Sequence, residues 1–137
     1  MSNVIIYQNP NGPNVCVCIP TGELSVSEVL AKDCPTGAVV VDSASLPEAD
    51  NDFFDAWRLV DGKVTVDLEA SRAIQLKRVN DAAIQEAQKR QLNTLAGIEN
   101  KVSDADFTAL LTAKRSKIVS AKSTEDLRAV TVADIAA

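Results

Sequence analysis

The spacing of the hydrophobic residues changes near residue 67. Before it, short runs of Val and Ile are separated by turns rich in Pro, Gly and Asn, a pattern typical of short strands. After it, apolar residues recur among Ala, Gln and Lys at helical spacing. The pattern predicts an α+β protein. A small N-terminal β-rich unit is expected at 1–66, followed at 67–137 by a long α-helix and a C-terminal helical hairpin.

Hairpins and one helix are expected in the first part. The predicted strands lie at 4–7, 15–19, 38–42, 58–60 and 63–66, and the predicted helix at 25–33. Asp61-Gly62 indicates a two-residue hairpin turn. In the second strand the Val and Ile side chains share one face and Cys16 and Cys18 the other, so we expect both faces to be covered. The segment 43–52 is expected to be an acidic loop.

A single long helix is expected to follow. The stretch 68–96 has no Pro or Gly and predicts a helix of about 30 residues, roughly 45 Å long, with Asp67 and Gly97 as its caps. Its apolar face is thin and rich in Ala, and consists of Ile74, Leu76, Val79, Ala83, Ala87, Leu92 and Leu95. Such a helix is too long and too polar for the core of a small globule, so a partner is expected to supply the missing burial.

Two shorter helices are expected after the long one. Ser103 begins the first, which should pack antiparallel on the long helix. Its apolar side consists of Phe107, Leu110, Leu111 and Ile118. Ser123 begins the second, and the tail 130–137, which is apolar and free of Lys and Arg, is expected to dock on something.

The aromatic residues gather just before the change in spacing. Phe53, Phe54 and Trp57 include the only Trp and two of the three Phe. We interpret them as the core of a hinge that plugs the junction between the β unit and the helices, with a platform for a ligand as the alternative. The apolar surface shared between helices or subunits is expected to consist of Leu76, Val79, Leu92, Leu95, Phe107, Leu110 and Leu111.

Charge disfavours two classes of partner. The 14 basic and 19 acidic side chains give a net charge of −5, whereas nucleic acids and anionic membranes attract basic surfaces. No run approaches the roughly 18 apolar residues that cross a bilayer, and the N-terminal segment lacks the features of a secretory signal. We therefore expect neither nucleic acid nor a membrane among the partners.

Most catalytic and metal-binding chemistry lacks its usual side chains here. There is no His, and the acidic cluster at 48–55 lacks the spacing of a calcium loop. We expect no catalytic residues, no metal and no cofactor, so an enzyme is the least favoured hypothesis. Cys16, Cys18 and Cys34 are expected to be small buried thiols of a protein made in a reducing cytoplasm, with an intermolecular disulfide as the alternative.

A series of short segments in the first part forms a recognisable order. The segments are Val4-Ile5-Ile6-Tyr7, Gly12, Val15 to Pro20, Cys34-Pro35-Thr36-Gly37, Val39 to Asp42, Leu46-Pro47, Phe54-Asp55-Ala56-Trp57 and Val66-Asp67-Leu68. This order resembles that of small tail-associated proteins of tailed bacteriophages, a group described as tail proteins or tail assembly chaperones. The resemblance covers residues 1 to about 80. The Gln-rich stretch 82–95 has no Pro and departs from the Arg-x-Pro-Leu-Leu element of that group.

The resemblance implies a virion structural protein that acts by protein–protein contacts. It would be a minor component of the tail, baseplate, collar or fibre attachment, located in the virion after assembly in the bacterial host cytoplasm. The implied partners are other phage tail or fibre proteins, together with further copies of the chain in a homo-oligomer. The alternative is a tail or tail-fibre assembly chaperone that is absent from the mature particle.

Overall fold

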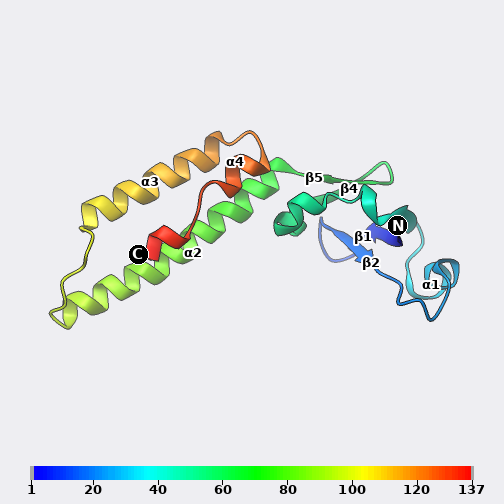
Figure 1. Ribbon diagram of the computed structural model, residues 1–137, viewed down its shortest axis with the longest axis horizontal. Coiled ribbons are helices and arrows are strands. Elements are labelled where there is room, and N and C mark those ends of the chain that lie inside the picture. The colour runs from blue at the N-terminus through cyan, green and yellow to red at the C-terminus, as the bar shows by residue number, and fades with distance from the viewer. Residues whose placement is uncertain (1, 137) are drawn as a thin grey trace. The chain divides into compact units, whose positions relative to one another are not determined.

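The computed structural model describes residues 2–136 and shows an α+β protein (Figure 1). The chain divides into two compact units, residues 1–67 and 68–137. This division lies one residue from the boundary expected between 66 and 67. Strands are found in the first unit, and the second contains the long helix and the helices that follow it.

A three-stranded antiparallel sheet forms the centre of the first unit. Strand β1 (Asn3–Gln8) lies between β2 (Val15–Cys18) and β3 (Val39–Asp42). In this register Ile5 pairs with Cys18 on one side and with Val40 on the other. Val4, Ile5 and Ile6 are all buried, which indicates that the central strand is covered on both faces.

The two covers come from different elements of the same unit. Helix α1 (Val26–Asp33) packs on β1 and β3, whereas the hairpin of β4 (Trp57–Val60) and β5 (Lys63–Val66) contributes Trp57 to the opposite face. Trp57 packs against Ile6 and Val15. In β2 itself Val15 is buried, but Cys16, Val17 and Cys18 are only partly buried, so the expectation that both faces of the second strand are covered is met only in part.

Local signals in the sequence account for two features of this unit. The Ser25 hydroxyl accepts a hydrogen bond from the Glu28 amide at 3.2 Å and begins α1, as the capping pattern predicts. Asp61 and Gly62 have φ angles of 52° and 74°, and Val60 pairs directly with Lys63. Positive φ at both central residues is the geometry of a type I′ turn, so the predicted two-residue hairpin is confirmed.

The expected acidic loop at 43–52 is wrong. Short 3₁₀ helices occupy most of it, η1 (Ser43–Ser45) and η2 (Glu48–Ala56), with a kink inside the second. The Asp42 carboxylate accepts a hydrogen bond from the Ala44 amide and begins η1. The Trp57 indole N–H donates to the Asp50 carbonyl at 3.1 Å. Side-chain caps of this kind, which satisfy backbone groups locally, order a segment that its polarity alone suggests is open.

The second unit is a helical hairpin with a docked tail. Helix α2 (Leu68–Leu95) is followed by α3 (Asp104–Ser120), α4 (Thr124–Arg128) and the short η3 (Ala133–Ala136). The Arg72 guanidinium near the start of α2 donates to the Ala121 carbonyl just after α3, and Arg90 near the end of α2 binds Asp104 at the start of α3. These two contacts show that α2 and α3 are antiparallel, as predicted (Figure 1).

Predicted caps end the long helix and begin the next. Gly97 has a φ of 74°, and its amide donates to the Thr94 carbonyl while the Ile98 amide donates to that of Asn93. This is the Schellman arrangement that a glycine at this position favours. The Ser103 hydroxyl accepts from the Asp106 amide at 3.1 Å and begins α3.

The buried face of α2 differs from the expected apolar face. It consists of Ser71, Gln75, Val79, Ala83, Glu86 and Arg90. Only Val79 and Ala83 belong to both sets. The polar members are tolerated because they have partners, as where the Gln75 amide donates to the Val130 carbonyl at 2.7 Å.

Candidate interaction surfaces

No compact chemical centre stands out among residues 2–136. Within that range, no group of three or more His, Cys, Asp or Glu side chains is placed to hold a metal ion. Nor does any helix in the described part of the chain combine the length and hydropathy needed to cross a membrane. The features that remain are hollows and exposed apolar faces, and each is described below within its own unit.

Trp57 is held firmly within the first unit. Its ring lies 4.9 Å from that of Phe54, with an angle of 55° between the ring planes. Phe53 is fully buried and Phe54 is partly buried. The structure thus brings two of the predicted aromatics into direct contact, and it places Trp57 in the core of its own unit. The role predicted for the three aromatics at the junction between units stays a prediction.

An open apolar hollow of about 500 Å³ lies beside these rings. Its lining consists of Val17, Ile19, Leu46, Glu48, Asn51, Phe54 and Trp57. Ile19 is largely exposed at its edge. The hollow is the feature on which the alternative interpretation of the aromatics, a platform for a ligand, depends.

The cysteines lie on the other face of the same sheet. Cys16 and Cys18 project from β2 toward the side that α1 covers, and Cys34 directly follows α1. Burial raises the pKa of the Cys34 thiol, and the neighbouring Cys18 raises it further. Burial also raises the pKa of Tyr7, with Cys16 beside it. All three thiols are free and only partly buried, and a raised pKa keeps Cys34 in its less reactive protonated form at neutral pH.

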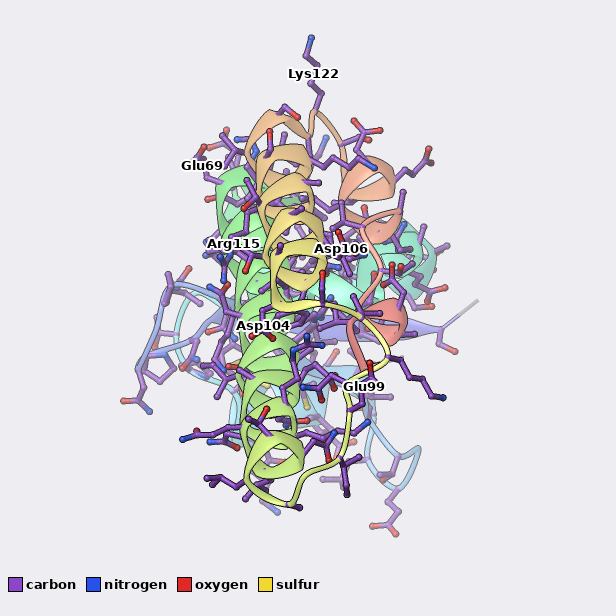
Figure 2. The ribbon with its side chains drawn as sticks, turned by 90° about the vertical axis from the view of Figure 1, so that its left-hand side faces the viewer. Glu69, Glu99, Asp104, Asp106, Arg115 and Lys122 are labelled. Atoms are coloured by element: carbon purple, nitrogen blue, oxygen red, sulfur yellow. The ribbon has the colours of Figure 1, made fainter. Side chains whose placement is uncertain are left out.

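Arg90 organises the end of the helical hairpin. Its guanidinium donates to the Val102 carbonyl and to Asp104 Oδ1, the latter at 2.8 Å, and lies 5.0 Å from the centre of the Phe107 ring. The Arg90 residue is only 7% exposed. Asp104 stands at the start of α3, and Figure 2 shows it in the same part of the molecule as Glu99 on the connection between the helices. Charge-assisted bonds to this connection hold the two helices together at the end where the connection joins them.

The outer side of the same region exposes several large aliphatic side chains. Ile84, Leu92 and Leu95 on α2 are 57%, 65% and 78% exposed, and Ile98 after the helix is 58% exposed. Of the three charged side chains in this stretch, Glu86 and Arg90 are buried and Lys89 is exposed. The exposed side of distal α2 therefore combines these aliphatic side chains with uncharged Gln side chains and one Lys.

A shallow groove runs between α2 and α3. One part, of about 500 Å³, is mostly apolar, and a second part of about 260 Å³ continues it toward Arg90 and Asp104. Ala87 and Phe107 line both parts. Leu76 and Ile84 line the larger part, so the groove adjoins the exposed apolar side of α2.

The C-terminal tail docks on its own helical unit. Val130 and Ile135 are buried. The Lys114 ammonium donates to the Thr131 carbonyl at 2.7 Å and pairs with Asp134 at 2.9 Å. The hydrogen bond from Lys114 to the Asp134 carboxylate is the main reason that the pKa of this carboxyl lies below its usual value. The expectation that the tail docks is confirmed for the described residues.

The predicted interaction residues of the second unit fall into three groups. Val79 and Leu111 are buried inside the unit, whereas Leu92 and Leu95 are exposed. Leu76, Phe107 and Leu110 are partly buried, and the first two line the groove. Their role in contacts between subunits stays a prediction.

Four residues that organise this unit were missed in the sequence. They are Gln75, Arg90, Asp104 and Lys114. Gln75 and Arg90 do share the helical spacing of Val79 and Ala83, but their polarity pointed to solvent. Asp104 and Lys114 had no signal in the pattern, because their partners are two side chains and one backbone carbonyl that lie elsewhere in the sequence.

No family model matches the chain, and neither a curated protein nor a solved structure is significantly similar to it.

Proposed function

We propose that the protein is a virion structural protein of a tailed bacteriophage that acts by protein–protein contacts. It would be a minor component of the tail, baseplate, collar or fibre attachment. The observation that carries the proposal is the exposure of large aliphatic side chains on distal α2, where Leu92 and Leu95 are exposed while Glu86 and Arg90 are buried. Exposed apolar surface of this kind marks a site of association.

The order of motifs in the first unit supports the phage assignment. The segments from Val4-Ile5-Ile6-Tyr7 to Val66-Asp67-Leu68 that resemble tail-associated proteins coincide with β1, β2, β3, η2 and the β4–β5 hairpin. The resembling part is thus a folded unit with its own core around Trp57. The second unit, where the resemblance ends, contributes the exposed apolar surface.

Contact explains the side chains of this protein better than catalysis does. The sequence has no His, and the buried charged side chains Arg90 and Lys114 bind backbone carbonyls and carboxylates of their own unit. Buried charges that are paired in this way hold structure in place. No reaction is therefore part of the proposal.

Mass spectrometry of purified particles tests the proposal. Particles of the phage that encodes the chain would be digested, and its peptides quantified against those of a major tail protein. We expect a fixed ratio that survives further purification of the particles. Absence of the chain from purified particles would contradict the structural role.

A tail or tail-fibre assembly chaperone is the second candidate. It is favoured by the same exposed residues, since a transient partner must present apolar surface while it is free. In that case the chain should co-purify with unassembled tail or fibre protein from infected cells and be missing from particles. Absence from both preparations would exclude both candidates.

A further inference from the structure

We propose that the distal half of α2 is the interface between two copies of this chain, which pair helix to helix in antiparallel orientation. The surface consists of Ile84, Gln88, Gln91 and Leu95, called the distal stripe below. All four side chains are exposed. This interface deepens the proposed function by naming a surface and a partner. It rests on that function only in the premise that the protein acts by protein–protein contacts.

The distal stripe has the geometry of a helix-pairing seam. Its members recur at spacings of four, three and four residues, so they lie on one side of the helix. Leu92 flanks the stripe and is 65% exposed. A single exposed aliphatic residue is ordinary on a protein surface, but three of them within twelve residues of one helix, Ile84, Leu92 and Leu95, indicate a contact.

Charge selects a second copy as the occupant. The chain has a net charge of −5, so two copies repel one another over most of their surfaces. Between Asp81 and Glu99 the only acidic residue is Glu86, which is buried, and the only exposed charge is that of Lys89. The distal stripe is therefore a place where two such chains can meet without bringing carboxylates together.

The distal stripe is also complementary to itself. Ile84 and Leu95 lie equally far from its midpoint, and so do Gln88 and Gln91. A two-fold axis at that midpoint sets Ile84 against Leu95 of the second copy, and Gln88 against Gln91 of the second copy. Aliphatic side chains then meet at both ends, and carboxamides, which both donate and accept hydrogen bonds, meet in the middle.

The groove between α2 and α3 extends this contact. Ile84 belongs to the distal stripe and also lines the groove, together with Ala87 and Phe107. A helix laid along the stripe therefore also reaches the edge of α3. Two hairpins paired in this way bring four helices together at their distal ends, with side chains packed between them as in a helical bundle.

Sedimentation velocity on the full chain tests the pairing. We expect the mass to rise with concentration from 14.6 kDa toward twice that value. In the variant Q88E/Q91E, carboxylates face one another at the two-fold axis, and we expect association about a hundredfold weaker. A wild-type chain that stays monomeric at every concentration overturns the inference, and so does a dimer that Q88E/Q91E leaves intact.

A matched variant controls for the added charge. Ala109 and Ser116 are exposed on α3 and do not line the groove. A109E/S116E adds the same two negative charges as Q88E/Q91E, and we expect it to dimerise like the wild type. Unchanged circular-dichroism melting curves would show that both variants are folded. Equal loss of the dimer in both variants would mean that net charge, not the distal stripe, controls association, and would overturn the inference.

A charge-swapped pair of variants provides a positive test. Q88K/Q91K should also be monomeric, because two ammonium groups then face one another. Mixed with Q88E/Q91E, it should form a heterodimer, since Lys and Glu alternate across the axis. Failure of the mixture to associate overturns the pairing through the distal stripe. All of these measurements use purified protein, so their outcome is separate from whether the chain is found in phage particles.

Discussion

At the scale of single residues, two side chains determine how their surroundings pack. Arg90 draws the connection and the start of α3 toward the end of α2, and in doing so covers Phe107. Trp57 joins the β4–β5 hairpin to the central sheet through Ile6 and Val15. Each lies within one unit, so the effect of replacing it is expected to be confined to that unit.

Replacing Arg90 with Leu should loosen the end of the hairpin. The change leaves the Val102 carbonyl and Asp104 without their donor, and we expect a loss of about 2 kcal/mol in the free energy of unfolding, since Asp104 is itself exposed to water. Hydrogen exchange should accelerate over residues 97–106. Asp104→Asn is the control, because it keeps the Oδ1 acceptor and should cost much less. Equal exchange in the wild type and the Arg90 variant would contradict the role of Arg90.

Replacing Trp57 with Ala should destabilise the first unit by about 3–5 kcal/mol, as large aromatic deletions in cores do. Trp57 is 3% exposed, and its indole N–H holds the Asp50 carbonyl. Chemical denaturation followed by circular dichroism measures the change. Trp57→Phe keeps the ring contacts but not the hydrogen bond, so its free energy of unfolding should lie between those of the wild type and Trp57→Ala. An unchanged free energy of unfolding in Trp57→Ala would contradict the role of Trp57 in this core.

At the scale of the elements, the tail is held to α3 by Lys114. Its ammonium serves both the Thr131 carbonyl and the Asp134 carboxylate, while Ile135 is buried close by in sequence. A short terminal segment buries little surface and stays ordered only when specific contacts hold it. The charged Lys114 anchor therefore contributes strongly to its docking.

Lys114→Met should release the tail while keeping an apolar stem on α3. We expect a loss of about 1–2 kcal/mol, because Asp134 is half exposed and its ion pair is partly screened. Amide exchange at Ile135, whose N–H donates to the Val132 carbonyl, should accelerate. Unchanged exchange at Ile135 would contradict the role of this anchor.

Docking of the tail should also weaken in acid. Because the hydrogen bond from Lys114 lowers the pKa of the Asp134 carboxyl, the folded state favours the carboxylate. The stabilisation is present above the ordinary carboxyl pKa and is lost as pH falls through the lowered value. Exchange at Ile135 measured against pH should show this loss, and Asp134→Asn should remove that part of the pH dependence. If exchange at Ile135 had the same pH profile in Asp134→Asn as in the wild type, the role of the Asp134 carboxylate in docking the tail would be contradicted.

The type and order of the elements follow from local chemistry. Turn residues such as Asp61-Gly62 and caps such as Ser25 and Ser103 act within a few residues, so the sequence is sufficient to place the elements that they bound. The buried face of α2 is different, because Gln75 and Arg90 are buried only through partners elsewhere in the chain. A polarity pattern has no information about those partners, and it therefore assigned the polar side of α2 to solvent.

At the scale of the whole molecule, the two units have separate interiors. Trp57, Ile6 and Val15 form a core within residues 1–67, while Val79, Leu111, Ile118 and other apolar residues are buried within 68–137. Neither interior is large, and small domains are only marginally stable. Association through the distal stripe would add burial to the second unit alone.

We expect fragments 1–67 and 68–137 to fold separately. Each would be produced on its own and examined by circular dichroism and by the dispersion of its amide NMR signals. The second fragment should be the less stable when dilute, and should gain stability with concentration if it dimerises. A fragment that is unfolded alone but folds when the other is added would contradict this independence.

The location of Trp57 and Tyr7 divides the optical signals of the molecule between its units. They are the only Trp and the only Tyr, and both lie in the first unit. The fluorescence and absorbance of Trp and Tyr therefore report on the first unit alone, whereas most of the helical far-ultraviolet signal comes from α2 and α3. Two unfolding curves recorded with these two signals would coincide only if the units unfold together. The intact chain can thus be followed one unit at a time without any label.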